Sequence, residues 1–112
     1  MGSEAVVVMI TAGSQAEAER VGEALLQSRL AACVNLLPGV NSFFWWEGKI
    51  DRAAEVLILV KTKRELMPDL LEQVRAVHSY EVFEAVALPI LAGSPEYLRW
   101  LEESTAEVAS RE

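Results

Sequence analysis

The sequence has few of the side chains that most often bind metals or react with substrates, with one cysteine and one histidine in 112 residues. A single cysteine cannot close a disulfide within the chain, and a structural zinc site needs about four Cys or His ligands. Disulfide scaffolds and zinc fingers are therefore excluded. Basic residues are also few, because 10 Lys and Arg stand against 17 Asp and Glu, a net charge of −7. An acidic protein repels phosphate backbones, so we expect no nucleic-acid partner.

Long apolar runs and targeting signals are missing as well. Residues 5–10 and 56–60 are the longest apolar runs, far short of the roughly 18 residues that a membrane helix needs. Val6 stands where a myristoylation signal requires Ser or Thr, and Glu4 interrupts a basic leader. We therefore expect a cytoplasmic protein with no membrane partner.

The residues that are present are enough for one folded unit. Apolar residues make up 52% of the chain, which supports a hydrophobic core, and the length is typical of a single domain. We expect residues 1–112 to form one domain with an ordered core at about 5–105, and the tail after Thr105 to fray.

The first quarter of the chain predicts a strand followed by a helix. Residues 5–11 are a run of mainly β-branched residues without polar alternation, typical of a strand covered on both faces. Ser14 and Glu17 have the spacing of a capping box, which opens a helix ending near Arg29. The helical pattern places Glu17 on the solvent face.

A long hairpin is predicted between residues 32 and 63. Its outgoing arm is interrupted by Pro38-Gly39, Glu47-Gly48 provides the turn, and residues 51–54 look like a bulge. Arms of roughly 13–15 residues would reach about 45 Å, although a domain of this size has a radius of gyration near 13 Å. Four consecutive aromatic residues at 43–46 lie in this overhang, where exposure would favour aggregation.

The second half repeats the pattern of helix and strand. A helix opens at Arg64 or Glu65, a core strand covers residues 84–90, and Ser94-Pro95 begins a further helix. The element order predicts an α+β, ferredoxin-like sandwich (βαββαβ) with an extra C-terminal helix and both main helices on one face of the sheet. The other face stays uncovered in one chain, so we expect oligomerisation.

Several stretches resemble the CutA divalent-cation tolerance family, in the family's order and spacing from about Val6 to Thr105. They read RLAACVN at 29–35, WEGK at 46–49, VKT at 60–62, HSYEVFE at 78–84, ALPI at 87–90 and GSPEYLRW at 93–100. The resemblance implies a homotrimer with paired hairpins, a link to copper and other divalent cations, a cytoplasmic location in bacteria, and kinship with the trimeric PII signalling proteins. Two departures concern residues 77–84: both prolines of the family's HPYxxPE pattern are absent, and Val77 replaces the first of two adjacent histidines found in some bacterial members.

The candidate metal ligands are Cys33, His78 and Glu84. A thiolate and an imidazole suit copper, and a carboxylate could complete the shell. The alternative is structural: Cys33 is a small buried apolar residue, and His78 finishes a helix whose dipole it complements. The resemblance strengthens the metal interpretation, and we expect weak binding because the ligands are few.

Two other functions stay open. A sensor of small molecules or anions, like the PII proteins, could use an inter-subunit cleft lined by basic residues, although no Gly-rich phosphate loop is present. The second open function is that of an interaction scaffold that binds no ligand. Catalysis is not expected, because no nucleophile elbow or triad is present. Glu81 and Glu84 could face one cleft with Tyr80, but paired carboxylates are usually surface charge. The basic residues considered for the cleft are Lys49, Arg52, Lys61, Lys63 and Arg64.

Overall fold

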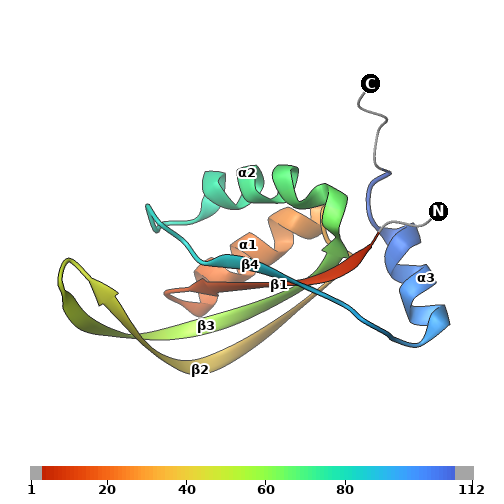
Figure 1. Ribbon diagram of the computed structural model, residues 1–112. Coiled ribbons are helices and arrows are strands. Elements are labelled where there is room, and N and C mark those ends of the chain that lie inside the picture. The colour runs from red at the N-terminus through yellow and green to blue at the C-terminus, as the bar shows by residue number, and fades with distance from the viewer. Residues whose placement is uncertain (1–3, 108–112) are drawn as a thin grey trace.

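The computed structural model describes residues 4–107, and its elements follow the predicted order of strands and helices (Figure 1). The elements are β1 (Ala5–Ala12), α1 (Gln15–Gln27), β2 (Cys33–Trp46), β3 (Lys49–Lys63), the 3-10 turn η1 (Arg64–Leu66), α2 (Met67–Val77), β4 (Ala85–Pro89) and α3 (Pro95–Ser104).

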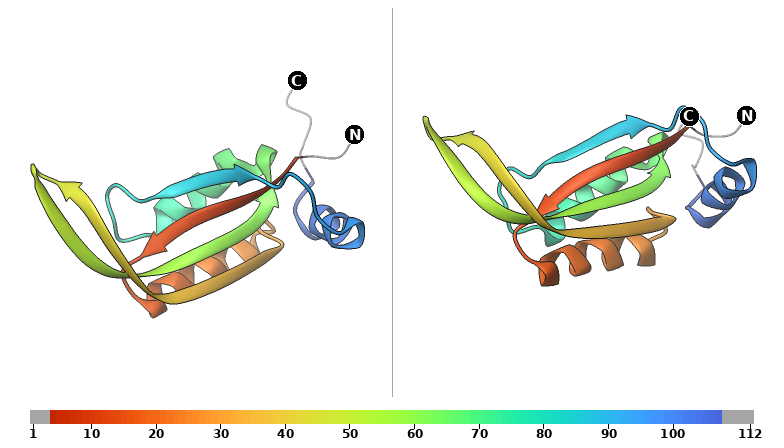
Figure 2. Two further views of the ribbon diagram at one scale, coloured as in Figure 1. Left: turned by 60° about the horizontal axis from the view of Figure 1, so that its bottom comes forward. Right: turned by 90° about the horizontal axis from the view of Figure 1, so that it is seen from below.

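The described strands form one antiparallel sheet in the order β2-β3-β1-β4. Helices α1 and α2 lie on one face, and α3 packs at the end of the sheet away from the hairpin tip (Figures 1 and 2). Fully buried side chains such as Ile10, Ile58, Leu25 and Leu70 fill the space between this face and the helices. The predicted mixed α+β architecture with an antiparallel sheet is confirmed.

The predicted cap at the start of α1 is confirmed, but the predicted orientation of Glu17 is wrong. The Ser14 hydroxyl accepts a hydrogen bond from the Glu17 backbone N–H at 3.1 Å. The Glu17 side chain was expected on the solvent face, yet this residue is only 4% exposed. Its carboxylate turns back toward neighbouring loops, where backbone N–H groups bind it.

The hairpin has the predicted turn and the predicted interruption of its outgoing arm, but it lacks the predicted bulge. Glu47 and Gly48 have φ angles of 50° and 79°, as a two-residue turn with both central residues left-handed requires. The predicted bulge at residues 51–54 is wrong, because these residues pair one-to-one with residues 41–44. The predicted interruption at Pro38-Gly39 is confirmed, because the register shift lies between Leu37 and Val40, where Pro38 has no N–H to donate and Gly39 has a φ of 81°.

The sheet face opposite α1 and α2 is apolar and open within one chain. Val7 pairs with Leu88, and Met9 lies between Val86 and Leu59 across the strands. Because cross-strand partners share a face, these side chains form a continuous surface. Leu88 and Val86 remain about half exposed.

The end of β3 holds both ends of the described chain. The Arg64 N–H donates to the Glu4 carbonyl at 2.8 Å, and Lys63 Nζ donates to the Ala106 carbonyl at 3.0 Å. Lys63 also pairs with Glu102 at 3.0 Å, so the chain is held one residue beyond Thr105. The expectations for the leader at residues 1–3 and for the tail at 108–112 lie outside the described residues.

Candidate functional site

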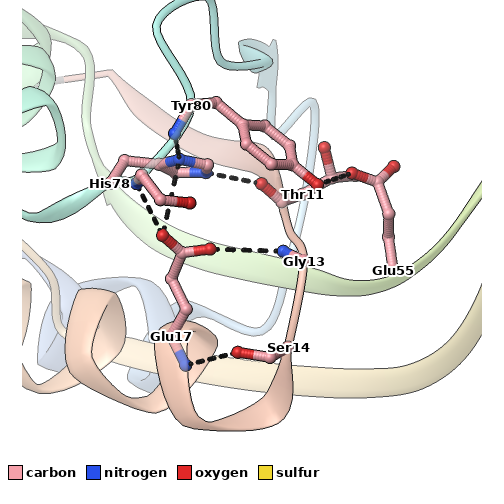
Figure 3. A network of polar contacts seen from close by, with 8 residues as sticks. Thr11, Gly13, Ser14, Glu17, Glu55, His78 and Tyr80 are labelled. Atoms are coloured by element: carbon pink, nitrogen blue, oxygen red, sulfur yellow. Dashed lines mark hydrogen bonds and ion pairs between the residues drawn. The ribbon is translucent and has the colours of Figure 1, made fainter.

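A buried polar network joins the turn after β1 to the loop after α2 (Figure 3). The Glu17 carboxylate accepts the backbone N–H of Gly13 at 3.3 Å and that of Ser79 at 2.6 Å. Burial alone would raise the pKa of Glu17, but the hydrogen bonds from Ser79 and Gly13 outweigh it, so this pKa lies below its ordinary value. The carboxylate thus fastens the 78–84 loop to the start of α1.

His78 lies at the centre of this network with no exposed side-chain surface. Its Nε2 is 2.7 Å from the Thr11 carbonyl, which can only accept, so Nε2 carries the proton. Its Nδ1 accepts the Tyr80 backbone N–H at 3.0 Å. Phe83 stacks on the ring with centroids 5.4 Å apart. Because both ring nitrogens are engaged, a metal could bind His78 only by displacing one of these hydrogen bonds.

Tyr80 carries the network across to the hairpin. Its hydroxyl donates to Glu55 Oε2 at 2.9 Å (Figure 3), and burial together with this carboxylate raises the pKa of Tyr80 to about 12. A Cβ at Gly13 would lie 3.1 Å from the Tyr80 hydroxyl, so the absence of a side chain there permits the close approach.

A cavity of about 740 Å³ lies between the hairpin and the 78–84 loop. Its walls include the aromatic residues at 43–46, and the end of β1 reaches it through Thr11. No Lys or Arg stands among its lining residues in the described chain. Its polar lining includes Tyr80 and the carboxylates Asp51, Glu55, Glu81 and Glu84.

The predicted metal ligands are not brought together within one chain. Cys33 pairs with Lys61, in the cross-strand row of Val7, whereas His78 binds the carbonyl of Thr11. Val7 and Thr11 are four residues apart along β1, which corresponds to about 13 Å at 3.3 Å per residue. Glu84 is exposed just before β4 and lines the cavity, which His78 does not. Within residues 4–107, no group of three or more His, Cys, Asp or Glu side chains could hold a metal ion.

Cys33 lies on the open face of the sheet and is half-buried. Its thiol is 3.7 Å from the Asn35 amide oxygen, which also accepts from Lys61. Burial raises the pKa of Tyr97 in α3, and the nearby Cys33 thiol raises this pKa further. Cys33 is therefore neither a fully buried core residue nor part of the His78 network.

The basic residues proposed for an anion cleft are dispersed along β3 and the start of η1. Lys63 is 3% exposed and paired with Glu102, and Arg64 pairs with Glu4. Arg52 lies over the Phe43 ring, 4.7 Å from its centroid. Because Lys49 and Lys63 stand at opposite ends of β3, one chain does not gather them into a single pocket.

Three acidic residues that the sequence interpretation left aside belong to the site. Glu17 was recognised only as a helix cap, because the spacing of a capping box says nothing about burial. The sequence pattern predicts a strand at Glu55 and a bulge at Asp51. Their spacing of four residues puts both side chains on one face of a regular strand, which was the available signal for a carboxylate-lined wall.

Comparison with known proteins identifies the family. A family model described as CutA1 divalent ion tolerance protein matches residues 6–104. The chain belongs to the CutA1 family. Over 99 residues it is 48% identical to the Thermus thermophilus divalent-cation tolerance protein CutA, covering 88% of this chain and 96% of that protein. It is 43% identical over 102 residues to the chloroplastic rice protein CutA 1, covering 91% of this chain but only 58% of the rice protein.

Solved structures of CutA1 proteins have the same fold. CutA1 from Oryza sativa superposes with a TM-score of 0.91 at 42% identity, covering 95% of this chain and 97% of that one. CutA1 from Thermus thermophilus gives 0.90 at 47% identity, covering 91% and 99%. The Archaeoglobus fulgidus structure, described as a periplasmic divalent cation tolerance protein, gives 0.86 at 45% identity, covering 89% and 97%. The family name denotes tolerance to divalent ions and not an enzymatic reaction. In the described part of the chain, the helices are too short or too polar to span a membrane.

Proposed function

We propose that this chain is a non-catalytic divalent-cation tolerance protein that acts as a homotrimer and binds copper weakly. The chain forms one domain and works in the cytoplasm. The match of residues 6–104 to the CutA1 family carries the proposal. The net charge of −7 also favours cations as ligands. Fractionating cells that express the full-length protein tests the location, and recovery outside the cytoplasm would contradict it.

The assembly is supported by surfaces that one chain leaves open. Trp45 is 73% exposed at the hairpin, the apolar sheet face carries Leu88 and Val86, and β2 and β4 stand at the two edges of the sheet. Burying such surfaces between copies is the ordinary outcome. Sedimentation equilibrium should give about three times the chain mass of 12.4 kDa.

Variants locate the interface in the same experiment. We expect Trp45→Ser to shift the protein toward smaller species, because Trp45 lies in the overhang. Leu26→Ser provides the control, since Leu26 is also exposed but lies on α1, on the covered side of the sheet. A wild-type monomer at micromolar concentration, or equal shifts in both variants, would contradict the proposed interface.

Copper binding is proposed through Cys33, His78 and Glu84, with the missing ligands contributed between copies of the trimer. Cys33 has the most available soft donor atom, because both nitrogens of His78 are occupied in the isolated chain. Copper should be titrated calorimetrically into the wild type, Cys33→Ala, Glu84→Gln and the Cys33→Ala, His78→Ala double variant. We expect the largest single loss of affinity at Cys33. Equal affinities for the wild type and the double variant would refute these ligands, provided that circular dichroism shows both folded.

A small-molecule sensor is the second candidate, favoured by the cavity of about 740 Å³. The cavity walls carry carboxylates without Lys or Arg, so anionic ligands such as nucleotides are disfavoured there. Calorimetry with ATP should therefore show no binding at this cavity. If neither copper, ATP nor a cationic compound binds, a ligand-free interaction scaffold becomes the better account.

A further inference from the structure

His78 is fixed to the body of the fold, but aromatic rings that cover it come from the loop after α2. Its backbone N–H donates to the Val74 carbonyl of α2 at 2.8 Å, and its ring nitrogen Nε2 donates to the Thr11 carbonyl of β1. Two rings of the following loop lie against the imidazole, Tyr80 with centroids 4.8 Å apart and Phe83 with centroids 5.4 Å apart. The burial of His78 therefore depends on where this loop lies.

The loop has fixed points on both sides of a short irregular segment. The Ser79 backbone N–H donates to the Glu17 carboxylate at 2.6 Å, which holds Ser79 beside the start of α1. Regular strand pairing resumes at Ala85, the first residue of β4. Between these points, residues 80–84 form neither helix nor strand, and Val82 is 72% exposed. We call residues 80–84 the latch.

Contacts at two positions of the latch keep it against the fold. The Tyr80 backbone N–H donates to His78 Nδ1 at 3.0 Å, and the Tyr80 hydroxyl donates to Glu55 Oε2 at 2.9 Å (Figure 3). The Phe83 ring stacks on His78, and the Arg75 guanidinium lies 5.1 Å from the Phe83 centroid. A hydrogen bond to a carboxylate is stronger than one between neutral groups. The bond from Tyr80 to Glu55 therefore contributes more to the closed position than the bond at Nδ1.

We propose that the latch opens and closes over His78, and that the bond from Tyr80 to Glu55 is the contact that keeps it closed. Opening frees Nδ1 of His78, which the Tyr80 backbone N–H otherwise occupies, and moves Glu84 at the same time. The closed latch is autoinhibitory, because a ligand reaches the imidazole only in the open state. Glu55 stands on β3 one residue beyond the end of the pairing with β1, so the closed state also depends on the position of the hairpin.

The consequence for copper rests on the proposed function, whereas the opening of the latch does not. If His78 is a copper ligand, the measured affinity is reduced in proportion to the fraction of molecules whose latch is open. A variant with a larger open fraction should then bind copper more tightly by the same factor.

Chemical modification of the histidine measures this open fraction without a metal. Diethyl pyrocarbonate transfers an ethoxycarbonyl group to an unprotonated imidazole nitrogen and releases ethanol and carbon dioxide, so it reacts with Nδ1 only when the Tyr80 N–H has left that atom. Because the chain has one histidine, mass spectrometry of its peptide reports on His78 alone. In the full chain in its native assembly, modification should be at least about tenfold slower than that of free N-acetylhistidine. Equal rates would overturn the proposal.

Removing one hydroxyl tests the closing contact. Tyr80→Phe loses the bond to Glu55 and keeps the backbone N–H, so modification of His78 should become about tenfold faster, the factor expected for a hydrogen bond to a carboxylate. Amide hydrogen exchange should also rise within residues 80–84. Exchange should stay slow at Ser79, whose N–H remains bound to the Glu17 carboxylate in the open state.

Two control variants separate latch opening from a general loosening of the fold. Tyr97→Phe removes a tyrosine hydroxyl from α3, at the other end of the sheet (Figure 1). Lys63→Met destabilises that same end, because it removes the pair with Glu102 and the bond to the Ala106 carbonyl. In both variants His78 should be modified at the wild-type rate.

Three results of these experiments would overturn the latch. The first is a wild-type rate in Tyr80→Phe, and the second is an equal acceleration in Tyr97→Phe or Lys63→Met. The third is a wild-type rate that falls as protein concentration rises, because His78 would then be exposed by dissociation of the assembly. If Tyr80→Phe is modified faster but binds copper no more tightly, the latch stands and His78 is refuted as a copper ligand.

Discussion

Replacing Glu17 by Gln should destabilise the fold far more than a change of one atom suggests. The carboxylate binds the backbone N–H groups of Gly13 and Ser79 through its two oxygens. Glutamine keeps one acceptor and turns an NH₂ group toward the other N–H. Leaving a buried donor unpaired costs about 1–3 kcal/mol, and weakening a charge-assisted bond adds about 1 kcal/mol. We therefore expect a loss of about 2–4 kcal/mol.

The pH dependence gives this prediction its signature. Because the pKa of Glu17 is lower in the folded protein than its ordinary value of 4.5, its ionised form stabilises the native state. This contribution is fully present above that ordinary value and is lost as the pH falls through the lower folded pKa. The difference between wild type and Glu17→Gln should therefore be large at neutral pH and shrink in acid.

Urea unfolding followed by circular dichroism, at equal chain concentration and at neutral and acidic pH, measures both effects. Glu23→Gln is the matched control, because Glu23 lies on the same helix and is exposed; it should change the unfolding free energy by less than about 0.5 kcal/mol. If Glu17→Gln unfolds with the wild type at neutral pH, the inferred anchoring of the 78–84 loop is refuted.

Substitutions at three further positions test other parts of the fold. Thr62→Val should stabilise the protein by about 1 kcal/mol, because Thr62 Oγ1 is buried without a hydrogen-bond partner in the described structure; a lower urea midpoint would contradict this. Lys63→Met should cost about 2 kcal/mol and increase hydrogen exchange near Ala106, since it removes the pair with Glu102 and the bond to that carbonyl; unchanged exchange would speak against the clamp. Gly48→Ala should lower the thermal midpoint by the equivalent of about 1 kcal/mol, because φ is 79° there, and Gly48→Asn should recover part of the loss.

The sequence was sufficient to predict elements that depend on local chemistry. The Glu47-Gly48 turn and the Ser14 cap are set by backbone preferences of adjacent residues, and both are present. The bulge predicted at residues 51–54 is absent, because these residues pair regularly with the opposite strand. The interruption predicted at Pro38-Gly39 is present, because the missing N–H of Pro38 is a local constraint on strand pairing.

The candidate site was harder to predict because it depends on positions across the sheet. Cys33 and His78 share ligand chemistry, yet Cys33 lies in the cross-strand row of Val7, whereas His78 contacts Thr11 near the other end of β1. The burial of Glu17 could not be predicted from its own helix, since its partner Ser79 lies 62 residues further along the chain. Such contacts depend on loop paths that periodicity does not encode.

The attachment of both chain ends beside the last residues of β3 has a mechanical consequence. Ala5 begins β1 opposite Lys63, and β4 ends with Pro89 opposite Val6. A force that pulls residues 4 and 107 apart would therefore act at one end of the β1–β4 ladder. Its hydrogen bonds would open one after another instead of together in shear. Along this axis the sheet should resist stretching weakly, whereas a force applied between the hairpin tip and α3 would run along the strands.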